Sequence, residues 1–218
     1  MLGVDAGAPD GLEALAEAGV DLYLREQGVA LLERARTLVK SPGVPAQAPV
    51  IAEARSRGMS VIGELELGWR LLPNEFIAVT GTNGKTTTVE LIGHIHRQAG
   101  LAVTVAGNVG AALSGLDERI DEHVTIVCEA SSFQLEDTLA FAPEAAVLLN
   151  LTADHLDRHG TLDAYLAAKL EIFARQGADD LAVAPVEFQP EGLPGGARRV
   201  SFGSEPDAQL SVRDGMLC

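Results

Sequence analysis

The sequence predicts an α/β fold in which helices cover both faces of a parallel sheet. Short continuous apolar runs, typical of strands buried on both sides, alternate with amphipathic segments that end at glycine. With 218 residues, 47% of them hydrophobic and 22% charged, the chain is long enough to bury a core. A glycine-rich loop, TGTNGKTTT at 80–88, lies between an apolar run and a helical segment at the centre of this pattern.

The first 72 residues alternate short helical and strand-like pieces. A doubly wound nucleotide-binding domain normally opens with a strand and a glycine-rich turn, and we recognise neither before Asp5. We therefore expect residues 1–72 to form an incomplete N-terminal domain. The pieces expected in it are a helix at 10–19, an apolar run at 37–39, a turn at 41–43, a helix at 49–58, and a strand followed by a loop or helix at 59–69.

Residues 73–218 carry stronger signals and predict a second α/β domain, which we expect to be incomplete at its C-terminus because the pattern stops within an element. Strands are expected at 76–80, 101–105, 123–130, 145–150 and 180–184, with weaker ones at 198–203 and 209–212. Helices are expected at 85–100 and 161–177, each ending at a glycine, and a turn with a helix start at 107–113.

Composition and charge exclude several classes of protein. The formal net charge is −15, and nucleic-acid binding needs a basic surface, so we expect no nucleic-acid partner. No apolar stretch reaches the roughly 20 residues of a membrane span, and the start shows no secretory signal, so we expect no membrane partner. The two cysteines, Cys128 and Cys218, form no CxxC motif. These features favour the reducing cytoplasm. We also expect a monomer.

The segment TGTNGKTTT has the context of a phosphate-binding loop. A strand precedes it and a helix follows, so backbone N–H groups and the helix N-terminus can face an anion. Lys85 can reach the β- and γ-phosphates, and the Thr86 hydroxyl can ligate magnesium. The usual GxxxxGK[ST] pattern fails at Val79, which leaves a tighter loop. The alternative is a glycine turn that caps a helix, with a solvated lysine.

Polar residues follow two later strands. Glu129 ends the run VTIVCEA, and ligands of open α/β sheets gather at the carboxyl ends of strands, so Glu129 is a candidate magnesium ligand or a simple edge acid. The segment NLTADHLDRHG also follows a strand. Here His155, nearest the strand end, is the candidate ligand; Asp154 can simply cap a helix, and His159 is interpreted as a solvated loop histidine.

Lys169 lies near the middle of an apolar stripe on the helix predicted at 161–177. At 100° per residue that stripe consists of Leu162, Tyr165, Leu166, Leu170 and Phe173. A lysine there either extends its stem to solvent or sits desolvated with a lowered pKa. A neutral amine can react with carbon dioxide to give a carbamate, which binds metal. The residues alone favour the solvent-reaching alternative.

Five segments resemble the Mur ligases: TGTNGKTTT, GNVG, EASSFQLE, LNLTADHLDRHGTLDAYLAAK and SPGVP, within a resemblance that runs from about residue 11 to 204. TGTNGK and the spacing from Asp154 and His155 to Lys169 are shared with folylpolyglutamate synthases, whereas SSFQLE resembles members that add D-glutamate. The resemblance implies an incomplete Rossmann-like N-terminal domain, then a P-loop-containing parallel-sheet ATP-binding central domain of Mur ligase type. It also implies that the C-terminal ligase domain is absent.

The activity that the resemblance implies is ATP-dependent ligation in peptidoglycan precursor synthesis. UDP-N-acetylmuramoyl-L-alanine is converted to an acyl phosphate, and the amine of D-glutamate displaces phosphate. The residues implied for ATP are Gly81, Thr82, Asn83, Gly84, Lys85, Thr86 and Thr87. Those implied for Mg²⁺ are Thr86, Glu129, His155 and Lys169 as a carbamate. Lys85, His155 and Lys169 take the catalytic roles, and the substrate contacts are Ser41, Gly43, Asn108, Ser131 and His155.

Three other functions are weighed against this one. Another Mur ligase, or a folylpolyglutamate synthase, would keep the site and change the substrate, which SSFQLE and SPGVP disfavour. A non-catalytic fragment that binds a nucleotide or UDP-sugar is the alternative from another class. A regulatory P-loop GTPase is disfavoured because no guanine-reading motif is present.

Overall fold

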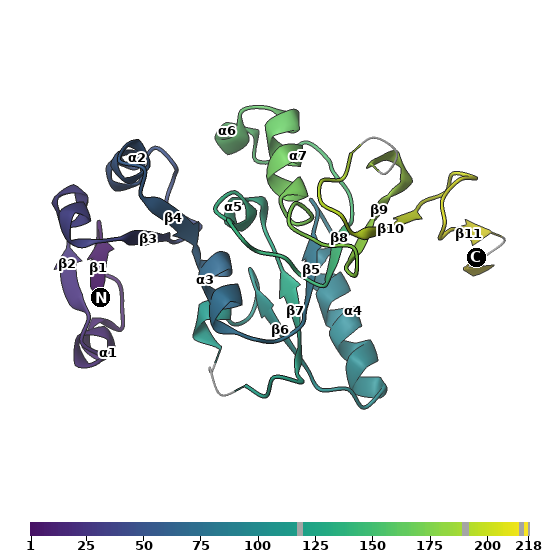
Figure 1. Ribbon diagram of the computed structural model, residues 1–218, viewed down its shortest axis with the longest axis horizontal. Helices are drawn as coiled ribbons and strands as arrows, with labels where there is room; N and C mark the ends of the chain where they lie inside the picture. Colours follow the sequence, from purple (N-terminus) through teal and green to yellow (C-terminus); the bar gives the residue numbers. More distant parts are fainter. Residues whose placement is uncertain (117–119, 189–191, 214–215, 218) are drawn as a thin grey trace. The chain divides into compact units, whose positions relative to one another are not determined.

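The computed structural model describes residues 1–116, 120–188, 192–213 and 216–217, which form two compact units, Met1–Ile62 and Gly63–Cys218 (Figure 1). The sequence predicts a domain boundary after residue 72. In the structure the helix α3 (Glu64–Leu71) belongs to the second unit, because Leu65 is buried in that unit's core and Gly68 lies against the backbone of Leu113.

The first unit is built from two strand pairs and short helices. Strand β1 (Leu2–Asp5) runs parallel to β2 (Asp21–Leu24), and β3 (Thr37–Lys40) pairs with β4 (Ser60–Gly63). The expectation that no strand precedes Asp5 was therefore wrong, because this strand has too few apolar residues to stand out. The helices are α1 (Leu12–Glu17), the 3-10 turn η1 (Val29–Arg34) and α2 (Pro49–Ser56), and the small core is Leu32, Ile51, Ala54 and Val61.

The second unit contains a parallel sheet, which confirms the predicted α/β class. Its described strands lie in the order β10-β9-β8-β5-β7-β6, and every neighbouring pair is parallel. The strands are β5 (Phe76–Thr80), β6 (Val103–Gly107), β7 (Thr125–Glu129), β8 (Ala145–Leu148), β9 (Leu181–Pro185) and β10 (Arg198–Phe202). A separate antiparallel pair consists of β11 (Val212–Arg213) and β12 (Met216–Leu217).

Helices pack against both faces of this sheet. Alternate residues of β5 point to opposite faces, so Phe76 and Ala78 join one core cluster while Val79 joins another with Val89 of α4. Figure 1 shows α4 on one side of the strands and α3, α5 and α7 on the other. The helices are α4 (Lys85–Gln98), η2 (Leu113–Gly115), α5 (Ser132–Leu135), α6 (Leu156–His159), α7 (Leu162–Leu170) and η3 (Val186–Phe188).

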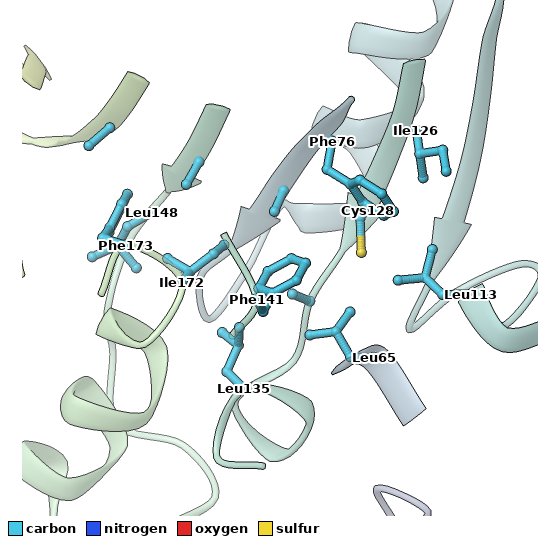
Figure 2. Close-up of a cluster of buried hydrophobic side chains, with 14 of the residues drawn as sticks. Leu65, Phe76, Leu113, Ile126, Cys128, Leu135, Phe141, Leu148, Ile172 and Phe173 are labelled. Carbon is cyan, nitrogen blue, oxygen red and sulfur yellow. The ribbon is translucent and has the colours of Figure 1, made fainter. Parts of the chain in front are cut away.

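Aliphatic and aromatic side chains together fill the larger core cluster, which Figure 2 shows. Phe141 makes edge-to-face contacts with Phe76 and Trp69, at centroid distances of 6.4 and 6.1 Å. Cys128 points into the same cluster, and burial raises the pKa of its thiol. Cys218 lies outside the described residues.

Two expected helices differ in the structure. The helix start predicted at 107–113 is a turn that leads to η2, because Gly107 and Gly110 adopt positive φ angles that a helix excludes. The helix predicted at 161–177 ends at Leu170, and turns continue the chain. No helix in the described part of the chain is long and apolar enough to cross a bilayer.

Candidate functional site

The glycine-rich loop joins β5 to α4 at the carboxyl end of the central strand. Gly81 has φ 149°, and a Cβ there would come within 3.0 Å of Leu149. Gly84 has φ 85° and precedes the first residue of α4, Lys85. Both positions therefore require glycine, and the loop is fixed in a conformation that turns the start of α4 toward the strand end.

A residue that the sequence analysis did not single out, Asn150, holds this loop from the neighbouring strand end. Its side chain accepts a hydrogen bond from Asn83 N and donates one to Asn83 O, both at 3.0 Å, while its carbonyl accepts from Thr82 N at 3.1 Å. Asn150 directly follows the apolar run AAVLL. Because ligands of parallel sheets bind at the carboxyl ends of strands, this position could have been predicted as part of the site.

Lys85 curls back over its own loop. Its Nζ donates to the carbonyl oxygens of Gly81 and Thr82, each at 2.9 Å. The ammonium group therefore lies above the loop backbone. An anionic phosphate held by the loop can be contacted from this position.

Thr86 and Glu129 meet where β5 and β7 end side by side. The Thr86 hydroxyl donates to Glu129 Oε2 at 2.7 Å, and the Asn108 side chain donates to Oε1 at 3.0 Å. Glu129 is buried, and these two hydrogen bonds orient its carboxylate toward the loop. Hydroxyl and carboxylate oxygens are the hard donors that Mg²⁺ prefers, so Thr86 and Glu129 fit this ion.

Asn108, implied as a substrate contact, lies against Glu129 through its backbone as well. Its N–H donates to the carbonyl of Glu129 at 2.8 Å. The preceding Gly107 has φ 111°, and a Cβ there would lie 2.3 Å from the same carbonyl oxygen. Only glycine allows the two strand ends to approach this closely.

Lys169 is buried at 1% exposure and donates to the carbonyl of Gly81 at 2.8 Å. The prediction that Lys169 extends its stem to solvent, which the residues alone favour, is therefore wrong. Its ammonium also lies 4.4 Å from the ring centre of Tyr165. Burial, and next the positive charge of Lys85, lower the pKa of Lys169 to about 7.

His155 and His159 lie on either end of α6 and differ in environment. His155 is half-exposed, has φ 51°, and its N–H donates to Asp154 Oδ1 at 2.8 Å. The interpretation of His159 as a solvated loop residue was wrong. Its side chain is 2% exposed, with Nε2 3.0 Å from Ser132 Oγ and Nδ1 3.0 Å from Glu136 Oε1. Burial lowers its pKa.

The remaining predicted residues lie in a helix cap, in a turn and in the first turn of α4. Ser131 is the N-cap residue of α5 and forms a reciprocal capping box with Gln134. In the first unit, Ser41 and Gly43 lie in the turn after β3, where Ser41 O accepts from Val44 N at 3.0 Å. The exposed Thr87 follows Thr86 on α4.

Across the described residues, no group of three His, Cys, Asp or Glu side chains gathers closely enough to hold a metal ion.

Comparisons with known proteins show which family the chain resembles. The family model of the Mur ligase middle domain matches residues 79–204. The chain is 46% identical over 183 residues to the UDP-N-acetylmuramoylalanine–D-glutamate ligase of Pelotomaculum thermopropionicum, covering 82% of the chain and 40% of that protein. It is 49% identical over 187 residues to the same-named ligase of Alkaliphilus oremlandii, covering 83% of the chain and 41% of that protein. The chain thus spans about 40% of the length of these relatives.

Solved structures show the same fold at lower identity. The Neisseria UDP-N-acetylmuramate:L-alanyl-γ-D-glutamyl-meso-diaminopimelate ligase superposes with a TM-score of 0.59 at 20% identity, covering 99% of this chain and 77% of that chain. MurF ligase from Thermotoga maritima, in complex with ADP, gives a TM-score of 0.54 at 20% identity, covering 84% of this chain and 51% of that one.

Proposed function

Because the chain belongs to the Mur ligase family, we propose that it carries the ATP-binding part of a ligase that joins D-glutamate to UDP-N-acetylmuramoyl-L-alanine in peptidoglycan precursor synthesis. The observation that carries this proposal is the hydrogen bond from Thr86 to Glu129, which joins the start of α4 to the end of β7 beside a glycine-rich loop. The names of the relatives support the choice of D-glutamate.

The reaction proceeds in two displacements. A carboxylate oxygen of UDP-N-acetylmuramoyl-L-alanine attacks the γ-phosphorus of ATP, and the bond to ADP breaks. The amine of D-glutamate then attacks the acyl carbon and loses a proton, and inorganic phosphate leaves. Both reactants of the first step are anions, so the site must hold them close and reduce their repulsion.

We propose a role in that task for each of the predicted site residues. Residues 81–87 hold the phosphates of ATP, and Lys85 moves from the loop carbonyls to the transferring phosphate. Thr86 and Glu129 would supply oxygen ligands to Mg²⁺, which would screen the negative charges. Asn108, Ser131, Ser41 and Gly43 are proposed to contact the UDP substrate.

We assign Lys169 to the same site as a carbamate that would help His155 hold a second Mg²⁺. The lowered pKa of Lys169, about 7, leaves roughly half of its amine neutral at neutral pH. The neutral nitrogen attacks carbon dioxide and loses a proton, which gives an anionic oxygen ligand. We further propose that the enzyme acts as a monomer in the cytoplasm.

The test is phosphate release from ATP by this chain, with Mg²⁺, UDP-N-acetylmuramoyl-L-alanine and D-glutamate, beside ATP binding measured by calorimetry. Lys85→Ala should abolish release and weaken ATP binding by about 10- to 100-fold, because a charge-assisted contact is lost. Release that is independent of D-glutamate would contradict the proposed acceptor. ATP binding without release, in this chain and in one extended to the relatives' length, would identify a non-catalytic binding module instead.

A further inference from the structure

Helix α6 places His155 in a conformation that needs support from elsewhere. The helix is a single turn, Leu156–His159, and a turn of that length is not stable alone. His155 precedes it with φ 51°, in the left-handed region that residues with a side chain rarely adopt. Such backbone persists only where surrounding contacts hold it.

His159 closes this turn onto α5. Its Nε2 lies 3.0 Å from Ser132 Oγ, and its Nδ1 lies 3.0 Å from Glu136 Oε1. Ser132 is the first residue of α5 and Glu136 follows the last, so one imidazole ring spans that whole helix. We call Ser132, Glu136 and His159 the His159 clasp.

Phe133 connects the clasp to His155. Its ring stacks on His159 at a centroid distance of 5.3 Å and 18° between planes, and it lies 4.9 Å from the ring of His155. The guanidinium of Arg158 lies 3.9 Å from the centre of the same ring. Tyr165 of α7 contacts both imidazoles, at 5.0 Å from His159 and 6.2 Å from His155. His155 is therefore packed between two rings that His159 also contacts.

The clasp has the residue types of a Ser-His-Glu catalytic triad, but its burial excludes that role. Ser132 is 2% exposed, and the His159 side chain is equally buried. A triad serine must present its oxygen to a substrate carbonyl. A hydroxyl enclosed in this way can instead fix the position of the ring that it contacts.

We infer that the His159 clasp positions His155, by fixing α6 on α5 and holding Phe133 against both imidazoles. His159 is thus a positioning residue of the proposed ligase site. The inference rests on the proposed function only in treating His155 as a group that acts on a ligand. The conformation of His155 can be measured without any ligand.

The experiment compares His159→Phe, which keeps a ring on Phe133 and removes both polar contacts, with His159→Gln, whose amide can still reach Ser132. His94→Phe is the matched control, because His94 is an exposed histidine on α4. Urea unfolding establishes that each variant is folded. NMR then records the backbone HN–Hα coupling and the nitrogen relaxation of His155 in the full chain.

We expect His159→Phe to change the His155 coupling and to increase its mobility, with partial recovery in His159→Gln and no change in His94→Phe. If His159→Phe is folded and His155 keeps its wild-type coupling and mobility, the inference is overturned. Should His159→Phe fail to fold, the same NMR measurements are made on Ser132→Ala, which removes only the contact between Ser132 and His159. A change in the coupling and mobility of His155 is then expected there.

A second arm separates this inference from the proposed function. Mn²⁺ binding in the presence of ADP is measured by electron paramagnetic resonance, and His159→Phe should weaken it by about tenfold, as loss of an orienting contact does. If His155→Ala weakens Mn²⁺ binding and His159→Phe does not, the positioning role is wrong. If His155→Ala itself has no effect, the metal role proposed for His155 fails, and the NMR result alone decides the inference.

Discussion

The carboxyl end of the sheet and the corner formed by α5 and α6 fix their side chains in different ways. At the sheet end, backbone constraints dominate: Gly81, Gly84 and Gly107 each have positive φ, and strand ends hold Glu129 in register. At the corner, two helices of one turn each are joined by side chains such as His159 and Phe133. The first arrangement depends on backbone conformations that glycines mark in the sequence, and the second depends on side-chain contacts that no local sequence pattern marks.

The largest expected effect tests the backbone side of this comparison. Gly107→Ala would place a methyl group 2.3 Å from the Glu129 carbonyl oxygen and force a side chain into φ 111°. We expect a loss of about 5 kcal/mol in the free energy of unfolding, measured by urea denaturation. Gly115→Ala is the control, since a Cβ there meets nothing within 4 Å. Equal stability of the two variants would contradict the argument.

A smaller effect concerns Lys169, which joins α7 to the loop at the sheet end. Its pKa is about 7 in the folded chain and 10.5 when unperturbed, so the unfolded chain binds more protons between these values. Stability should therefore rise with pH from about 7 to 10.5, by on the order of 4 kcal/mol. Urea unfolding in carbon dioxide-free buffer measures this slope. Lys169→Met should flatten it, and an unchanged slope would refute the assignment.

The smallest effect sharpens the comparison at the corner. Ser131→Ala removes the side-chain oxygen that accepts from Gln134 N and caps α5. We expect a loss of about 1 kcal/mol in the free energy of unfolding. Ser114→Ala is a suitable control, because Ser114 donates to Glu64 Oε1 through its backbone N–H, which alanine keeps. A loss as large as that of Gly107→Ala would contradict the comparison, because a single side-chain cap would then matter as much as the backbone constraint at the sheet end.

This difference explains what could be predicted from the sequence. The strand at Phe76–Thr80, the glycine loop and the start of α4 follow from local patterns, and the structure places Thr86 beside Glu129 as parallel strand ends require. The interpretation of His159 as solvated was wrong because its contacts with Ser132 and Glu136 arise from the packing of α6 on α5, which no local sequence pattern marks. Periodicity also placed Lys169 on an apolar stripe, but only the structure shows that Lys169 donates a hydrogen bond to Gly81 O.

The order of strands in the sheet has a consequence for synthesis of the chain on the ribosome. Strand β5 is the first of the six to emerge, yet it pairs with β7 and β8, so Phe76 meets Ile126 and Ile77 meets Ala145. The glycine loop therefore cannot gain its support until those later strands have left the exit tunnel. Until then the apolar segment FIAV has no strand partner, and it is exposed to aggregation.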